Sequence, residues 1–167
     1  RRKAALMFGA QIKLFRLAGF DVNLDLSWVF IALLISWTLA TGYFPELYPG
    51  FESATYWSMG VIGAAGLFLS IVLHELSHSV VARRYGIPIS GITLFIFGGV
   101  AQMEREPPTA RAEFMMAIAG PLASLGLSLF FYTCAALAVA AGAAATITGV
   151  LTYLALINLI VAVFNMV

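Results

Sequence analysis

Apolar residues fall into four long blocks along the chain, separated by short stretches that hold most of the charged and turn-forming residues. Each block is long enough to cross a bilayer, whose hydrocarbon core of ~30 Å takes about 20 residues of helix. The expected membrane spans are 26–43, 54–85, 110–141 and 147–167. At 1.5 Å per residue the second span would measure about 48 Å, so its end must tilt or project beyond the membrane.

Two shorter segments have the pattern of strands. Residues 20–25 alternate strictly between apolar and polar, residues 11–14 begin a similar alternation, and Ala18-Gly19 supplies a turn between them. Residues 89–103 are rich in β-branched and aromatic side chains and are broken by Gly98-Gly99, which predicts two further strands with a tight turn. An interfacial amphipathic helix over residues 3–17 is the alternative to the first hairpin.

Composition and charge agree with a membrane protein. Of the 167 residues 62% are hydrophobic and 10% charged, whereas a soluble domain carries about 25% charged residues. The nine Lys and Arg residues lie before the first block and between the second and third, and the other two loops have none. The positive-inside rule therefore makes the N-terminus and residues 83–111 cytoplasmic. Net charge of +1 gives no indication of nucleic acid as a partner.

The expected fold is a polytopic α-helical membrane protein, with about four transmembrane helices and short β-hairpins at the cytoplasmic side. The chain, 1–167, reads as a single core domain of a multi-pass protein of the cell membrane, with the lipid bilayer as its solvent.

The only two histidines lie in the second apolar block, in the sequence His74-Glu75-Leu76-Ser77-His78. Residues four apart share one face of a helix, so both imidazoles reach the same small object. In this H-E-x-x-H pattern two histidines bind zinc and the glutamate is the general base. Burying one charged residue at the centre of a membrane helix costs about 2.5–3.5 kcal/mol, and a divalent cation offsets that cost.

The motif predicts hydrolysis of a peptide bond. Two histidines leave a tetrahedral zinc open for a third protein ligand and a water, whose pKa falls to about 7. Glu75 would take the proton of that water and pass it to the departing amine. One alternative is a membrane metal transporter with the histidine pair as a transit site, although no second block supplies a constellation of His, Asp or Cys. A structural or regulatory membrane partner with a vestigial motif is the other.

Four landmarks together carry a family resemblance over nearly the whole chain. They are residues 74–79 (HELSHS), 97–101 (FGGVA), 119–121 (AGP) and 164–165 (FN). In this order they resemble the site-2 protease family of intramembrane zinc metalloproteases. The resemblance implies regulated intramembrane proteolysis, the cleavage of a single-pass transmembrane protein within the bilayer.

The resemblance also assigns residues. It makes His74 and His78 the zinc ligands, Glu75 the general base, and Asn165 a polar group near the scissile carbonyl. The apolar strand before Gly98-Gly99 would lie beside the site, where an unwound substrate could pair with it. The residues expected to pair are Ile92, Leu94, Ile96, Gly98 and Gly99.

Two further expectations come from the resemblance. The third zinc ligand of the family is an aspartate in an Asp-Gly segment after the last core span, so it is expected beyond Val167, with this chain a core truncated before it. The loop between the second and third blocks is too short for a PDZ domain, which implies the compact branch of the family. Members of that branch often carry CBS domains.

Overall fold

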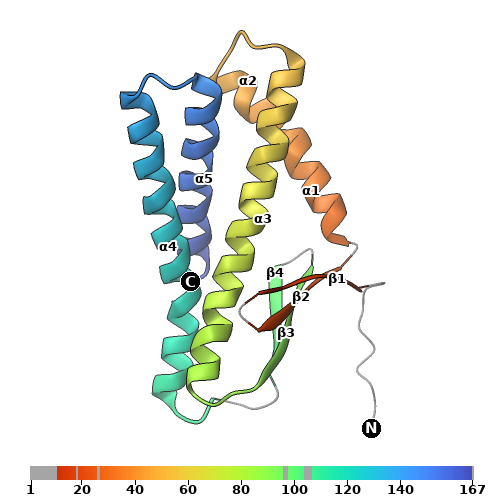
Figure 1. Ribbon diagram of the computed structural model, residues 1–167, viewed down its shortest axis with the longest axis vertical. Coiled ribbons are helices and arrows are strands. Elements are labelled where there is room, and N and C mark those ends of the chain that lie inside the picture. The colour runs from red at the N-terminus through yellow and green to blue at the C-terminus, as the bar shows by residue number, and fades with distance from the viewer. Residues whose placement is uncertain (1–10, 18, 26, 96–97, 104–106, 167) are drawn as a thin grey trace.

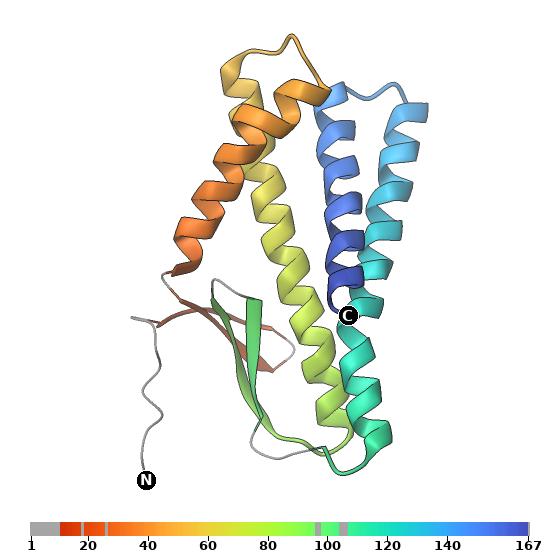
Figure 2. The ribbon, with the colours of Figure 1, turned by 180° about the vertical axis from the view of Figure 1, so that it is seen from behind.

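The computed structural model describes residues 11–17, 19–25, 27–95, 98–103 and 107–166. Within this part four helical segments are long and apolar enough to cross a membrane, as the sequence predicts. They cover Ser27–Leu47, Ser53–Arg84, Ala110–Ala140 and Ala145–Phe164. The four form an elongated bundle, with a small sheet beside one end (Figures 1 and 2).

The first span is longer than predicted. It consists of α1 (Ser27–Thr38), a π-helical segment η1 (Leu39–Tyr43) and the single turn α2 (Phe44–Leu47). The prediction ended this span at Tyr43, and Pro45 follows. That proline lies in α2 directly after η1, and the backbone stays helical from η1 into α2. The predicted first residue of this span, Leu26, lies outside the described residues.

The other three helices begin and end close to the predicted bounds. They are α3 (Ser53–Arg84), α4 (Ala110–Ala140) and α5 (Ala145–Phe164). Thr109 caps α4, because its side chain accepts a hydrogen bond of 3.1 Å from the backbone N–H of Ala112.

Helix α3 is the centre of the bundle, and glycines let its neighbours approach closely. A Cβ added to Gly60 would lie 2.6 Å from the carbonyl oxygen of Ser36 in α1. One added to Gly66 would lie 2.8 Å from the methyl carbons of Leu154 in α5. Lipid is as apolar as these side chains, so the association of membrane helices depends on such close packing.

The two predicted hairpins form, and they join into one sheet. The strands are β1 (Gln11–Leu17), β2 (Phe20–Asp25), β3 (Ile89–Phe95) and β4 (Gly98–Met103), in the order β1-β2-β3-β4. Each hairpin is antiparallel, whereas β2 and β3 pair in parallel. Alternation along a single segment does not reveal this pairing, because two membrane spans separate β2 from β3.

The predicted turn at Gly98-Gly99 is displaced. Both glycines belong to β4, where Gly98 pairs with Phe95 and Gly99 pairs with Leu94. The connection therefore falls at residues 96–97, which lie outside the described residues.

The sheet packs against the C-terminal half of α3. Phe20 and Val22 of β2 are fully buried together with Val72 of α3. The guanidinium carbon of Arg83, at the end of α3, lies 3.7 Å from the centroid of the Phe20 ring, a cation–π contact. These contacts hold the sheet beside the part of α3 that carries the two histidines.

Candidate metal centre

Helix α3 places His74 and His78 on one face, as their spacing predicts. Their Nε2 atoms lie 3.2 Å apart, and the ring planes meet at 75°. His74 is buried and His78 is half-buried. Two ring nitrogens therefore point to a single place at the contact between α3 and α4.

Helix α4 supplies a hydrogen-bond partner for the other nitrogen of each ring. The Nδ1 atom of His78 lies 2.7 Å from the backbone carbonyl oxygen of Met116. A carbonyl only accepts, so Nδ1 of His78 carries the proton and its Nε2 presents a lone pair. The Nδ1 atom of His74 lies 2.8 Å from Oγ of Ser124, a side chain that is fully buried.

Between these two partners on α4 lies Gly120, and it leaves space at the nitrogens. A Cβ added to Gly120 would overlap Nε2 of His74 and Nε2 of His78. Only glycine therefore fits where α4 crosses the histidine pair. Helix α4 thus approaches α3 closely at the imidazoles themselves.

The residues fit a zinc ion. Two nitrogens bound to tetrahedral zinc at 2.0–2.1 Å lie about 3.3 Å apart, and the observed Nε2 separation is 3.2 Å. A hydrogen bond at the far nitrogen is also the usual support of a zinc-bound histidine. Within the described ranges no third His, Cys, Asp or Glu joins the two histidines to make a group of three. A transporter would need further groups of that kind along its path, and the same ranges contain none.

Both aspartates of the chain lie in β2, with partners of their own. Nζ of Lys13 lies 2.8 Å from Oδ1 of Asp21 in an ion pair, and the backbone N–H of Ser27 donates to Asp25 at 2.9 Å. Glu75 follows His74 and so lies about 100° around α3 from it. Its side chain is half-buried, and its backbone carbonyl accepts a hydrogen bond from the Ser79 hydroxyl.

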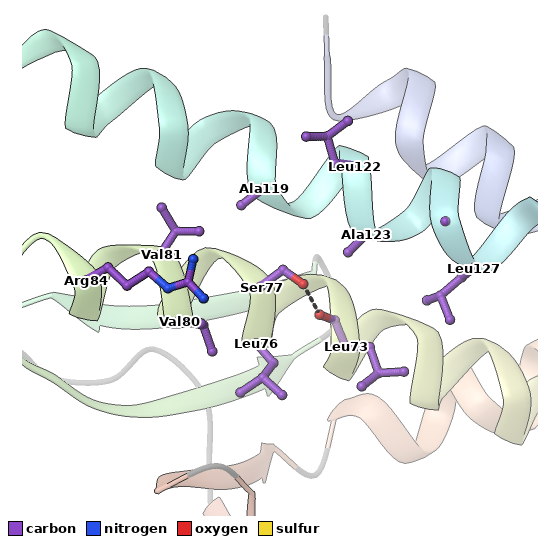
Figure 3. A pocket seen from close by; sticks show the side chains of 11 residues that line it. Leu73, Leu76, Ser77, Val80, Val81, Arg84, Ala119, Leu122, Ala123 and Leu127 are labelled. Atoms are coloured by element: carbon purple, nitrogen blue, oxygen red, sulfur yellow. Dashed lines mark hydrogen bonds between the residues drawn. The ribbon is translucent and has the colours of Figure 1, made fainter.

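A separate apolar groove of about 550 Å³ runs between α3 and α4 (Figure 3). The Ser77 hydroxyl in it donates to the carbonyl of Leu73 at 2.8 Å, and Arg84 is its one charged side chain. The groove contains neither histidine nor Glu75, so it is distinct from the metal centre. Its remaining walls are Leu76, Val80, Val81, Ala119, Leu122, Ala123, Gly126 and Leu127.

Asn165, the residue expected near the scissile carbonyl, directly follows α5. It lies beside a face of α4 that is not the face in contact with the histidines. Its side-chain amide donates to the carbonyl of Val161 at 2.8 Å, and it lines a small pocket with Pro121. In the described part of the chain no hydrogen bond joins Asn165 to either histidine. Asn158, which lies seven residues earlier and so two turns back along α5, is buried, and its side-chain amide donates to Oγ of Ser70 at 3.0 Å.

The strand expected to receive a substrate is in the middle of the sheet. Strand β3, which holds Ile92 and Leu94, is paired with β2 on one side and β4 on the other. Strand β4, which begins with Gly98 and Gly99, is the outer strand on this side of the described sheet. Of the residues predicted to pair with a substrate, these two glycines therefore belong to an edge strand, whereas Ile96 lies outside the described residues.

An H-E-x-x-H centre buried between membrane-length helices is the arrangement of a membrane-embedded metalloprotease. The sequence model of Peptidase family M50 matches residues 62–142. Two relatives are named "Putative zinc metalloprotease". Rip3 of Mycobacterium tuberculosis is 40% identical over 155 residues, which are 93% of this chain and 39% of that protein. The relative sll0528 of Synechocystis is 42% identical over 118 residues, 71% of this chain and 31% of the relative.

A solved structure agrees with these matches. The site-2 protease from Methanocaldococcus jannaschii superposes with a TM-score of 0.62 at 28% identity, over 95% of this chain and 65% of that one. The chain therefore belongs to the site-2 protease family. It spans about two fifths of the length of the Mycobacterium relative.

Sequence reasoning missed the partners of the imidazoles on α4. The Met116 carbonyl and the Ser124 hydroxyl were not predicted as parts of the site. Their signal is the four-residue spacing of Met116, Gly120 and Ser124, which places all three on one helix face. That spacing is visible in the sequence, but which helix the face contacts is not.

Proposed function

We propose that this chain is the core of an intramembrane zinc metalloprotease, which hydrolyses a peptide bond within a transmembrane helix of a membrane-anchored protein. One observation carries the proposal: His74 and His78 belong to one helix that is long enough to cross a membrane, and their Nε2 atoms lie 3.2 Å apart. Gly120 leaves the space there that a bound ion needs. Membership of the site-2 protease family supports the same reaction.

The residues take distinct roles. His74 and His78 would hold zinc through Nε2, while the Met116 carbonyl keeps the proton of His78 on Nδ1. Zinc, when bound, supplies a Lewis acid that activates water at neutral pH and polarises a carbonyl. Glu75 takes the proton of the attacking water and delivers it to the departing amine. The resemblance implies an aspartate as the third ligand, and neither Asp21 nor Asp25 is placed for it.

The substrate would be a single-pass membrane protein whose helix unwinds beside the sheet. Helical peptide bonds are shielded by their own hydrogen bonds, so an extended segment is needed, and a free strand edge stabilises one. The edge of β4 at Gly98 and Gly99 suits this role, because β3 is already paired on both sides. Asn165 would lie near the scissile carbonyl once substrate is bound.

We place the N-terminus and residues 83–111 in the cytoplasm, from the distribution of Lys and Arg. The sheet and the histidine-bearing end of α3 lie toward the same end of the molecule (Figure 1). His78 precedes Arg83 by five residues, about 8 Å of helix. The metal centre would thus lie below the headgroups of the cytoplasmic leaflet.

The test compares two substitutions in the full-length protein. Glu75→Gln should retain one zinc per chain and abolish cleavage of a single-pass reporter substrate in proteoliposomes, because the amide cannot take up a proton. Glu113→Gln, on an exposed side chain in the first turn of α4, removes the same charge and should cleave normally. Normal cleavage by Glu75→Gln would refute the assignment of the base, and a wild type that binds no zinc would refute the metal centre.

A further inference from the structure

Ser124 is a fully buried hydroxyl on a helix that otherwise exposes most of its surface. A hydroxyl in apolar surroundings is costly unless it is hydrogen-bonded. Its Oγ lies 2.8 Å from Nδ1 of His74. The hydroxyl of Ser124 is therefore engaged with the ring of a candidate metal ligand.

The two histidines are supported in different ways. Nδ1 of His78 meets a backbone carbonyl, which no side-chain substitution removes and which admits only one tautomer. Nδ1 of His74 meets a hydroxyl, which can donate or accept. Nε2 of His74 presents a lone pair in the neutral ring only if Nδ1 holds the proton, so the Ser124 oxygen must accept from it.

We propose that Ser124 is a positioning residue, which accepts a hydrogen bond from Nδ1–H of His74 when Nε2 of that ring binds zinc, and so holds the ring in the orientation that zinc binding needs. This inference rests on the proposed zinc centre. The competing explanation is that Ser124 only joins α4 to α3, as buried hydroxyls in membrane helices commonly do.

The chain offers a matched control for that explanation. Ser128 lies one turn further along α4, and its Oγ donates to the carbonyl of Ala155 in α5 at 2.8 Å. It also joins α4 to a neighbouring helix by a hydrogen bond, but its partner is a backbone carbonyl and not an imidazole. Ser128→Ala removes helix-joining energy alone, whereas Ser124→Ala removes that energy and the support of His74.

The experiment uses the full-length protein and two readouts. Zinc affinity is measured by competition with a chromophoric chelator, and the hydrogen bond at Nδ1 of His74 is followed by the ¹⁵N shift of that nitrogen in the metal-free and the zinc-bound protein. Ser124→Ala should weaken zinc binding ten- to a hundredfold, about the usual cost of losing such an outer hydrogen bond. The ¹⁵N shift of Nδ1 of His74 should also move, because that nitrogen loses its hydrogen-bond partner. Ser128→Ala should change neither readout.

Each outcome decides a different question. Equal zinc affinities for the two alanine variants, or an unchanged ¹⁵N shift of His74 Nδ1 in Ser124→Ala, would overturn the role of Ser124. A wild type without zinc affinity would overturn the proposed function, yet the ¹⁵N shift of His74 Nδ1 in the metal-free protein would still test its hydrogen bond with Ser124. Alanine favours helix more than serine does, and circular dichroism confirms that both variants fold.

Discussion

The space that Gly120 leaves at the histidine pair makes Gly120→Ala a sharp test of the metal centre. The added methyl group would lie 2.5 Å from Nε2 of His74, and closer still to Nε2 of His78. Ordinary contact with a Cβ begins at 3.4 Å, so the His74 nitrogen must retreat by about 0.9 Å. Neither the helix nor the ring can yield without cost, since His74 is buried.

The size of the effect follows from the geometry of zinc. Distances to zinc ligands vary by only about 0.2 Å around their usual values, so a displacement of about 0.9 Å removes at least one nitrogen from the ion. The loss of an outer hydrogen bond alone costs about ten- to a hundredfold in affinity. We therefore expect Gly120→Ala to weaken zinc binding by more than about a hundredfold, or 2.7 kcal/mol.

The control is Gly126→Ala on the same helix, where an added Cβ meets nothing within 4 Å. It should leave zinc affinity unchanged and stabilise α4 by up to about 1 kcal/mol, the usual preference of helices for alanine. Chelator competition on the full-length protein measures both variants. If Gly120→Ala bound zinc as tightly as Gly126→Ala, the ion would not lie between α3 and Gly120, and the reasoning would be refuted.

Three smaller predictions concern stability. Asn158→Leu should destabilise the bundle by about 1 kcal/mol in detergent unfolding. The variant loses the hydrogen bond to Ser70, but it also removes the Oδ1 atom, which has no partner among the described residues. A loss above about 3 kcal/mol would contradict this prediction. The interaction with Lys13 lowers the pKa of Asp21 below 3.8. The ionised carboxylate of Asp21 therefore stabilises the fold fully above its unfolded pKa, and this stabilisation is lost as the pH falls through its folded pKa. The protection factors of the amides in β1 and β2, which are corrected for intrinsic exchange, should therefore fall at acidic pH in the wild type but not in Asp21→Asn. Thr109→Ala should cost about 1 kcal/mol in thermal unfolding by removing the cap of α4, whereas no change would mean that the cap contributes nothing.

Much of this protein was predictable because its strongest signals are local. The length and apolarity of each block predict the four helices, and alternation at Phe20–Asp25 predicts a strand. The spacing of His74 and His78 predicts a shared face, since 3.6 residues make one turn. None of these needs knowledge of a partner element.

What the sequence left open depends on which elements meet. The parallel pairing of β2 with β3 joins segments separated by two spans, and it is this pairing that leaves β4 as the edge. Ser124 belongs to a run of small residues that is equally typical of helix packing, and only the docking of α4 on α3 brings its hydroxyl to His74. The chain by itself thus determined the helices, the strands and the shared face of the two histidines. The tertiary structure decided which groups contact those imidazoles and which strand lies at the edge of the described sheet, because contacts between distant segments have no periodicity that can be read along the chain.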